Sequence, residues 1–168
     1  MIRSAVPSDI DDIAALHVKT WQAAYRGLLP DAHLEGLDPA QRAVMWSKVL
    51  TQPDALVLVA TDRQAVVGFC SILPSRDADA SSAIGEITAI YVDPSVWRSG
   101  TGSALVDAAV EAARLRSFSE LTLWVLANNT HARAFYEALG FHSNGHTKTE
   151  EFPGFSSESV RYRRRVVA

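Results

Sequence analysis

The residues with the clearest capacity for chemistry lie in the segment from Gly85 to Gly102, which reads GEITAIYVDPSVWRSGTG. A strand predicted at 84–92 leads into a short polar loop that ends in Gly100-Thr101-Gly102, and a helix predicted at 102–116 follows directly. The first N–H groups of a helix have no partner inside the helix, and the helix dipole adds positive potential there. Glycine lets the main chain approach an anion closely. The segment is therefore suited to binding the phosphate of a ligand.

The glycine loop alone leaves a structural turn as an equally good interpretation. The third glycine of a Rossmann fingerprint is missing, and no Gly-Lys-Ser/Thr of a Walker loop follows. A second motif at 129–141 changes this balance. It reads NTHARAFYEALGF and opens another helix after a strand predicted at 121–126, with Asn129 as the helix cap and Gly140 at the left-handed C-terminal position.

The two motifs together resemble those of the GCN5-related N-acetyltransferase (GNAT) superfamily. The opening Ile2-Arg3-x-Ala5, followed by Asp9, is similar to the first strand and helix of many members. The resemblance covers essentially the whole chain in the expected order. It implies an enzyme that transfers an acetyl group from acetyl-CoA, as cosubstrate, to an amine acceptor.

The resemblance also implies which residues hold coenzyme A. The strand edge at Ile90-Tyr91-Val92 would bond the pantetheine arm, and Asn129 would bond the pantetheine or steady the last helix. The main-chain amides of the loop would wrap the pyrophosphate, and its expected members are Trp97, Arg98, Ser99, Gly100, Thr101, Gly102 and Ser103. Trp97 stands where many members have Gln or Arg, and Arg98 where glycine is common. Arg98 either contacts phosphate or points to solvent.

Two side chains are candidates for proton transfer. Glu86 lies on the central strand, where many members of the family carry a glutamate, and a carboxylate there can take a proton from an amine directly or through water. Its alternative is a strand-end acid that faces solvent or pairs with an arginine. Tyr136 corresponds to the family position near the thioester sulfur, and its phenol, with an ordinary pKa near 10, can protonate a departing thiolate. Its alternative is packing beside Phe135.

The segment around Trp21 and Tyr25 is the candidate acceptor pocket. These two aromatic residues lie one turn apart on the same helix face, and the resemblance implies that this helix and the following loop line the acceptor site. Packing in the core is the alternative for part of the cluster. The acceptor itself stays open, from small amines and amino acids to peptide N-termini.

The remaining elements must position these motifs. We expect strands at 2–6, 55–61 and 65–73, a flexible loop at 76–82, and two strands within 142–166 around the turn at 152–155. The first helix is expected to be capped by Ser8, and the second to follow Asp38-Pro39 with Val44, Val49 and Leu50 inward. The order predicts an α/β (mixed α+β) fold. It has a mixed, mostly antiparallel sheet of about six to seven strands, flanked on both faces by about four helices.

Length, charge and residue content limit the classes of function that the chain can have. The chain has 168 residues and a net charge of −3, which suits one domain, residues 1–168, and gives no global signal for nucleic acid or an anionic membrane. No apolar run is long enough to span a bilayer, so a cytoplasmic location is expected. The single Cys70 is interpreted as a buried apolar residue, and His142 and His146 lack a third ligand, so no metal is expected.

Near the C-terminal end, Val160, Tyr162 and Val166 alternate with Arg161, Arg163 and Arg165. This period predicts a strand with a solvated basic face rather than a nucleic-acid site. Three alternatives to a small-molecule acetyltransferase stay open. They are a non-catalytic acyl-CoA sensor, an acetyltransferase for peptide or protein N-termini, and a module that uses the arginines to bind nucleic acid. A homodimer is possible, as is common in the resembled family.

Overall fold

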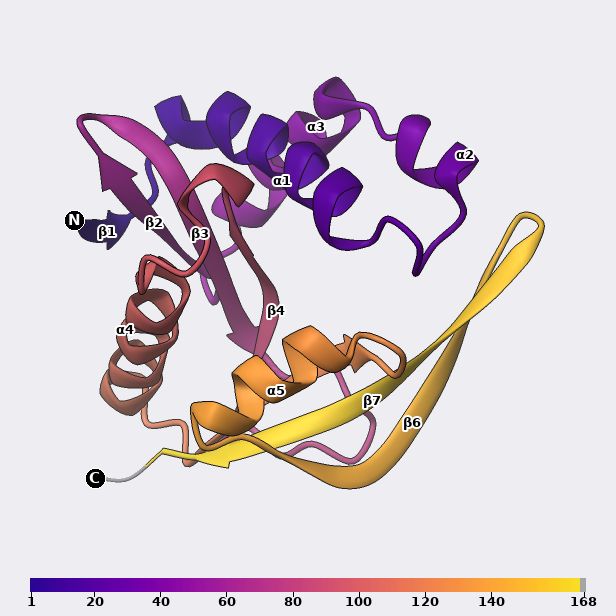
Figure 1. Cartoon of the computed structure of the whole chain (residues 1–168). Helices are drawn as coiled ribbons and strands as arrows, with labels where there is room; N and C mark the ends of the chain where they lie inside the picture. Colours follow the sequence, from indigo (N-terminus) through magenta and orange to yellow (C-terminus); the bar gives the residue numbers. More distant parts are fainter. Residues whose placement is uncertain (167–168) are drawn as a thin grey trace.

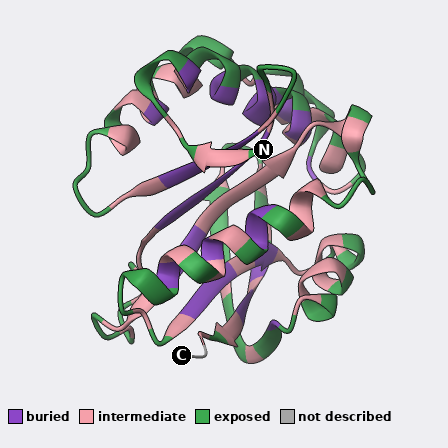
Figure 2. Ribbon diagram, turned by 90° about the vertical axis from the view of Figure 1, so that its left-hand side faces the viewer, coloured by how far each residue is buried: buried purple, intermediate pink, exposed green. Residues whose placement is uncertain are grey.

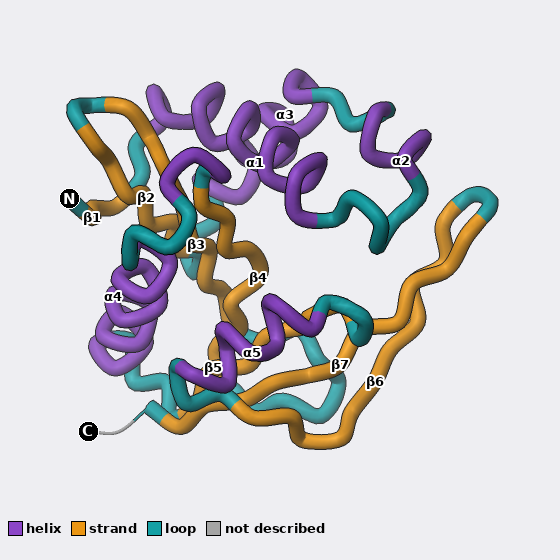
Figure 3. Tube along the Cα trace, viewed as in Figure 1, coloured by secondary structure: helices purple, strands orange, loops and turns teal. Residues whose placement is uncertain are grey.

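The computed structural model describes residues 1–166, which form one seven-stranded sheet with helices on both faces (Figures 1 and 3). The strand order is β1-β2-β3-β4-β5-β7-β6. The strands are β1 (Ile2–Ser4), β2 (Leu56–Asp62), β3 (Ala65–Pro74), β4 (Ile84–Val92), β5 (Glu120–Leu126), β6 (His142–Phe152) and β7 (Phe155–Arg165). The α-helices are α1 (Ile10–Ala24), α2 (Asp31–Glu35), α3 (Pro39–Leu50), α4 (Thr101–Leu115) and α5 (Thr130–Ala138). Short 3-10 turns occupy Pro7–Asp9 and Pro94–Val96.

This architecture confirms the predicted fold class. Every neighbouring pair of strands is antiparallel except β4 and β5, which are parallel. The parallel pair requires a crossover, and α4 provides it. The described chain holds one more α-helix than expected, the single short turn α2 between the first two long helices. None of its helices combines the length and apolar character that crossing a membrane would need.

The strands alternate their side chains between two hydrophobic clusters, one on each face. In β2, Val57 and Val59 point to the cluster under α1 and α3, whereas Leu58 and Ala60 point to the cluster under α4. Leu105 of α4 is fully buried in the second cluster. Figure 2 shows the buried residues on the strands and on the helix faces turned toward them. Burial of apolar surface on both faces is what holds the sheet as a central layer.

The sheet opens between β4 and β5. Their parallel pairing covers only Ile84–Ile87 with Glu120–Leu123. Beyond it, β4 continues along β3 and β5 continues along β7. Thr88 is the extra residue of a bulge, since Ile72 pairs with Ile87 and Ser71 pairs with Ala89. The distal part of β4 is therefore paired on one side only, and a gap opens between the two strands.

Two expectations for the helical half were wrong in detail. Ser8 is not a helix cap, because Pro7–Asp9 form a 3-10 turn in which the Asp9 carboxylate accepts the N–H of Val6 at 2.8 Å. Asp9 also pairs with Arg3, which lowers the pKa of its carboxyl group. Val44 is not inward but 57 % exposed, and Trp46 is the buried residue of α3.

The expected start of the second long helix and the expected ends of α5 are confirmed. Asp38 accepts the N–H of Ala40 at the start of α3, and Asn129 accepts the N–H of Ala132 at the start of α5. Gly140 has a φ of +81°, the left-handed region in which glycine ends a helix freely. Phe141 then folds back and is 2 % exposed.

His17 joins α1, α3 and β4 in the interior. It accepts the indole N–H of Trp46 at its Nδ1, over 3.1 Å, and stacks on the ring of Tyr91 with centroids 5.0 Å apart. Because this site is dry, desolvation lowers the pKa of His17 to about 3, with a smaller contribution from Arg42. His17 is therefore a neutral hydrogen-bond acceptor in the folded protein.

Replacing His17 with glutamine is expected to weaken the acid sensitivity of folding. Between the ordinary histidine pKa of 6.5 and its folded value of about 3, the unfolded chain binds a proton that the folded chain does not. The free energy of unfolding therefore falls as the pH falls below about 6.5, with a slope of about 1.4 kcal/mol per pH unit from this residue. Denaturant unfolding from about pH 7 to about pH 5 measures the slope, and equal slopes for His17→Gln and the parent would contradict the assignment.

Candidate active site

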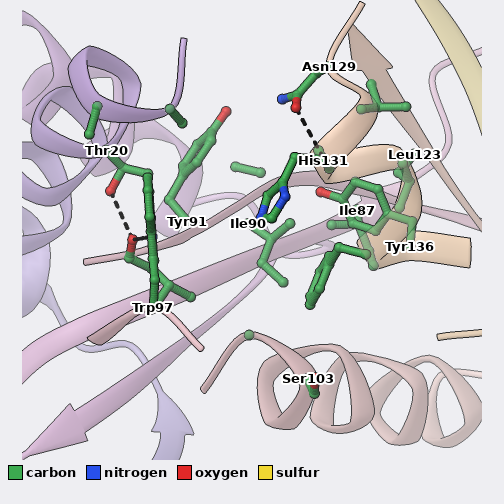
Figure 4. A pocket seen from close by; sticks show the side chains of 18 of the residues that line it. Thr20, Ile87, Ile90, Tyr91, Trp97, Ser103, Leu123, Asn129, His131 and Tyr136 are labelled. Atoms are coloured by element: carbon green, nitrogen blue, oxygen red, sulfur yellow. Dashed lines mark hydrogen bonds between the residues drawn. The ribbon is translucent and has the colours of Figure 1, made fainter. Parts of the chain in front are cut away.

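A cleft of about 750 Å³ lies where β4 and β5 separate (Figure 4). Its walls come from the distal part of β4, the loop before α4, the inner side of α5 and the end of α1. Most of the residues expected from the sequence lie on its walls: Tyr25, Ile90, Tyr91, Val92, Trp97, Arg98, Gly100, Gly102, Ser103, Asn129 and Tyr136. Ser99 belongs to the same loop and Thr101 begins α4, although neither is among the lining residues. Glu86 and Trp21 are not among the lining residues either.

The main chain of β4 offers a free edge to this cleft. The N–H of Asp93 donates to Val67, so the main-chain groups of Asp93 and of every second residue before it face β3. By this alternation Tyr91 turns its main chain to β3, and Ile90 and Val92 turn theirs to the cleft. The edge predicted at 90–92 is therefore present, with its polar main-chain groups on Ile90 and Val92.

Trp97 ties the loop to the strand. Its indole N–H donates to the carbonyl of Val92 at 2.7 Å, and the hydroxyl of Thr20 approaches the same oxygen at 3.4 Å. Figure 4 shows both contacts on the cleft wall. Although Trp97 is 46 % exposed, its polar atom is thus engaged by the protein. The tryptophan orients the loop, and the N–H of Val92 stays on the cleft side.

The loop itself presents main-chain N–H groups. Arg98 and Gly100 both have left-handed backbones, with φ of +63° and +86°, which turns the chain tightly before α4. The N–H of Ala104 is the first to reach a helical acceptor, the carbonyl of Gly100. The N–H groups at 101–103 precede that bond and have no acceptor inside the helix. A Cβ on Gly102 would lie 3.2 Å from Cζ of Phe135, so a glycine lets α4 and α5 approach here.

Tyr136 reaches the cleft from α5. Its ring packs at 5.3 Å from Phe135 and 6.1 Å from Phe141, and Figure 4 shows the hydroxyl directed into the cleft. Burial raises the pKa of the phenol, with smaller contributions from Tyr91 and Cys70. The ring of Tyr136 thus packs beside Phe135, as one interpretation expected, and its hydroxyl faces the cleft. Its role as a proton donor stays a prediction.

Glu86 lies beside the cleft on β4 but is covered. Its side chain is 4 % exposed and pairs with Arg76, whose Nη2 is 2.9 Å from Oε1. The main-chain N–H of Arg76 also donates to Oε2 at 3.2 Å. The two alternatives to a catalytic base at this position were an acid that faces solvent and an acid paired with an arginine. The geometry shows the pairing with an arginine. Its neighbour Ile87 packs under α4, so Glu86 points to the opposite face of the sheet.

Trp21 and Tyr25 divide the expected acceptor segment between two roles. The rings are 4.9 Å apart, edge to face. Tyr25 lines the cleft, and burial raises the pKa of its phenol well above the ordinary value. Trp21 packs behind it against Tyr91, with the Arg42 guanidinium 5.5 Å from its ring centre. The segment therefore reaches the cleft through Tyr25 and the core through Trp21.

His131 and Trp124 are among the residues of the cleft wall that the sequence analysis missed. His131 projects into the cleft from the first turn of α5, as Figure 4 shows, and its place two residues after Asn129 was the signal available. Trp124 lines the wall from β5 and donates its indole N–H to Asp77 at 3.1 Å. Its position in an apolar strand concealed that role.

The loop expected to be flexible is tied down by a buried arginine. Arg161 of β7 is 7 % exposed and pairs with Asp77 at 3.1 Å and Asp79 at 2.7 Å. Asp79 and Asp77 raise the pKa of Arg161, and Arg161 lowers the pKa of Asp79 to about 2. The expectation of a solvated arginine face on β7 was therefore wrong at Arg161, because the two aspartates come from a distant loop.

The comparisons with known proteins assign this chain to a family. Residues 16–141 match the model of the acetyltransferase (GNAT) family, and the chain therefore belongs to it. YuaI of Bacillus subtilis, described as an uncharacterized N-acetyltransferase, is 32 % identical over 138 residues, which cover 82 % of this chain and 77 % of YuaI. The match confirms the class of enzyme expected from the paired motifs, an acetyl-CoA-dependent N-acetyltransferase.

Solved structures share the fold over almost the whole chain. A ribosomal-protein-alanine N-acetyltransferase from Brucella melitensis superimposes with a TM-score of 0.78 at 24 % identity, covering 98 % of this chain and 99 % of that one. The PaiA N-acetyltransferase from Thermoplasma acidophilum, solved in complex with coenzyme A, gives a TM-score of 0.74 at 18 % identity and 98 % coverage of both chains. These identities support the fold, and the acceptor is a separate question.

Removing Arg161 is expected to destabilise the protein. Arg161→Met leaves the carboxylate of Asp77, which is 17 % exposed, without its cation, at a cost of about 1–3 kcal/mol in the free energy of unfolding. Arg165→Met is the matched control, because Arg165 lies on the same face of β7 and is exposed. Thermal and denaturant unfolding measure both variants. Equal stability of the two would show that the Arg161 pairs contribute nothing.

Proposed function

We propose that the protein transfers the acetyl group of acetyl-CoA to a primary amine by direct attack, within one catalytic domain formed by residues 1–168. The observation that carries this proposal is the free edge of β4, which runs straight into the left-handed loop and the first N–H groups of α4, which have no acceptor inside the helix. That sequence of donors suits a ligand with an extended amide arm and a pyrophosphate at its end. Membership of the GNAT family supports the same ligand.

The residues present fit coenzyme A. The main-chain groups of Ile90 and Val92 would bind the pantetheine arm, as an added strand does. The amides of the loop would hold the pyrophosphate, and the side chains of Trp97, Ser99 and Thr101 would keep the loop in shape. Trp97 is anchored on Val92, and the hydroxyls of Ser99 and Thr101 are 2.8 Å apart. Asn129 is used as the cap of α5, so its role would be to hold that helix at the cleft.

Acetyl-CoA supplies the acyl group as an activated thioester. Glu86 would take the proton of the amine, directly or through water, and the amine nitrogen would form the new C–N bond at the acyl carbon. As the C–S bond breaks, Tyr136 would give its proton to the sulfur. The raised pKa keeps the Tyr136 proton in place at neutral pH. N–H groups of β4 would polarise the acyl carbonyl. Holding the two reactants together contributes to the rate independently of these groups.

A non-catalytic sensor of acyl-CoA is the second candidate, and one observation favours it. Glu86 is covered by Arg76 and does not line the cleft, so this carboxylate is not open to an amine as the structure stands. A sensor would bind acetyl-CoA and release no thiol with any amine. The engaged carboxylate is thus the point on which the two candidates differ.

Conservative changes at the two proton-transfer residues are expected to slow catalysis while leaving CoA binding intact. Tyr136→Phe removes the proton donor and Glu86→Gln removes the base, each lowering kcat about 10²-fold with a good acceptor. CoA release followed with a thiol reagent measures kcat, and calorimetry measures CoA affinity. Wild-type kcat in both variants would refute the assigned roles.

Replacing Gly100 is expected to weaken CoA binding, in addition to the stability cost of a side chain in a left-handed backbone. Gly100 and Gly154 have nearly equal φ values, +86° and +85°, and a Cβ on either meets nothing within 4 Å. Gly100→Val and Gly154→Val therefore carry a similar cost, about 1–2 kcal/mol for a side chain in this region. Only Gly100→Val places a branched side chain in the phosphate loop, and it should weaken CoA binding at least about tenfold. Equal CoA affinity of the two variants in calorimetry would place the phosphate elsewhere.

A further inference from the structure

The ion pair of Arg76 and Glu86 joins a buried carboxylate to an exposed guanidinium. The Glu86 side chain is 4 % exposed and that of Arg76 is 67 % exposed. The guanidinium contacts the carboxylate through Nη2 at 2.9 Å and Nε at 3.5 Å, and the main-chain N–H of Arg76 adds a third contact at 3.2 Å. The arginine side chain thus covers the carboxylate from the solvent side.

The main chain of Arg76 is anchored, and its side chain is not. Asp77, the next residue, binds the indole of Trp124 and the buried Arg161. These contacts hold the loop on the far strands of the sheet. Because only the exposed side chain of Arg76 is free of them, its rotation uncovers Oε1 of Glu86 without movement of the loop, while the main-chain N–H of Arg76 stays on Oε2.

When it leaves Glu86, the guanidinium of Arg76 is taken up either by water or by another anion. Glu86, Asp77 and Glu150 all raise the pKa of Arg76, so its guanidinium stays charged. Asp77 is already bound by Trp124 and Arg161, and Glu150 contacts Lys148 at 3.4 Å. An anion brought by the acceptor is therefore the partner that would draw Arg76 away from Glu86 at the moment an amine arrives.

We propose that the acceptor is a free α-amino acid, whose carboxylate pairs with Arg76 while its amino group faces Glu86. An α-amino acid carries its two opposite charges on one carbon, and Arg76 and Glu86 present the complementary charges side by side. Binding replaces the Arg76–Glu86 ion pair with two others, one between Arg76 and the substrate carboxylate and one between Glu86 and the substrate ammonium. The same step uncovers the Glu86 carboxylate. This inference rests on the proposed acetyl transfer and names the substrate class of that site.

The proposal separates free amino acids from other amines. A peptide N-terminus has an amide in place of the α-carboxylate, and a polyamine has no anion, so neither presents Arg76 with a carboxylate on the carbon that carries its reacting amine. Both would meet a site whose base stays covered. A planar guanidinium binds a carboxylate with two parallel hydrogen bonds, so the arginine at position 76 suits this group better than a lysine would.

The test compares each L-amino acid with its own α-carboxamide, on the full-length protein with acetyl-CoA, by thiol release. At least one amino acid is expected to react with a kcat/KM about 10–100-fold above that of its carboxamide, the range for a charge-assisted hydrogen bond. Arg76→Gln should bring that ratio close to one. Arg114→Gln is the matched control, because Arg114 pairs with Glu111 on the exposed side of α4 and should keep the wild-type ratio.

The ratio distinguishes substrate recognition from a structural role. A merely structural Arg76 would lower both rates together and leave the ratio unchanged, which overturns the proposal, as does a wild-type protein that prefers carboxamides or simple amines. The wild-type comparison needs no variant, so the proposal can fail even if Arg76→Gln does not fold. A different result is that none of the amines causes thiol release although CoA binds in calorimetry. That result refutes the proposed acetyl transfer itself.

Discussion

The short parallel pairing of β4 with β5 is the constraint on which the rest of the molecule depends. Four residues on each strand pair, and then each strand follows a different neighbour. The crossover that a parallel pair demands brings the start of α4 to the open end of the gap, and α5 closes the other side. The cleft, its free main-chain donors and the glycine loop are thus consequences of one break in strand pairing.

Much of this arrangement was predictable because its signals are local. Alternating apolar residues define the strands, Asn129 and Asp38 mark helix starts, and Gly140 marks a helix end. The glycine loop and the helix of Tyr136 carried enough pattern together to indicate the family, and the family model confirms it. The expected positions at 90–92 and 97–103 all lie on β4, in the loop beside the cleft or in the first turn of α4.

The remainder was not predictable because it depends on contacts between distant residues. Arg161 looked like one of several surface arginines until Asp77 and Asp79, more than eighty positions away, neutralised and buried it. Val44 and Trp46 are both apolar, and Trp46 is the one that meets distant partners, the Nδ1 of His17 and the ring of Phe69. Glu86 shows the same limit, because its strand position was correctly predicted whereas its cover, Arg76, comes from the preceding loop.

The free edge of β4 has a consequence for the protein without its ligand. Main-chain groups at Ile90 and Val92 that are ready to accept a pantetheine arm are equally ready to accept a strand from another chain. The free edge inside the cleft is therefore a site at which another chain could pair and aggregate. The bulge at Thr88 and the narrow space between α4 and α5 limit the length of edge that is open to such pairing. A ligand bound along this edge would cover it and would also stabilise the fold by mass action, so the proposed cosubstrate would protect its own enzyme from strand pairing.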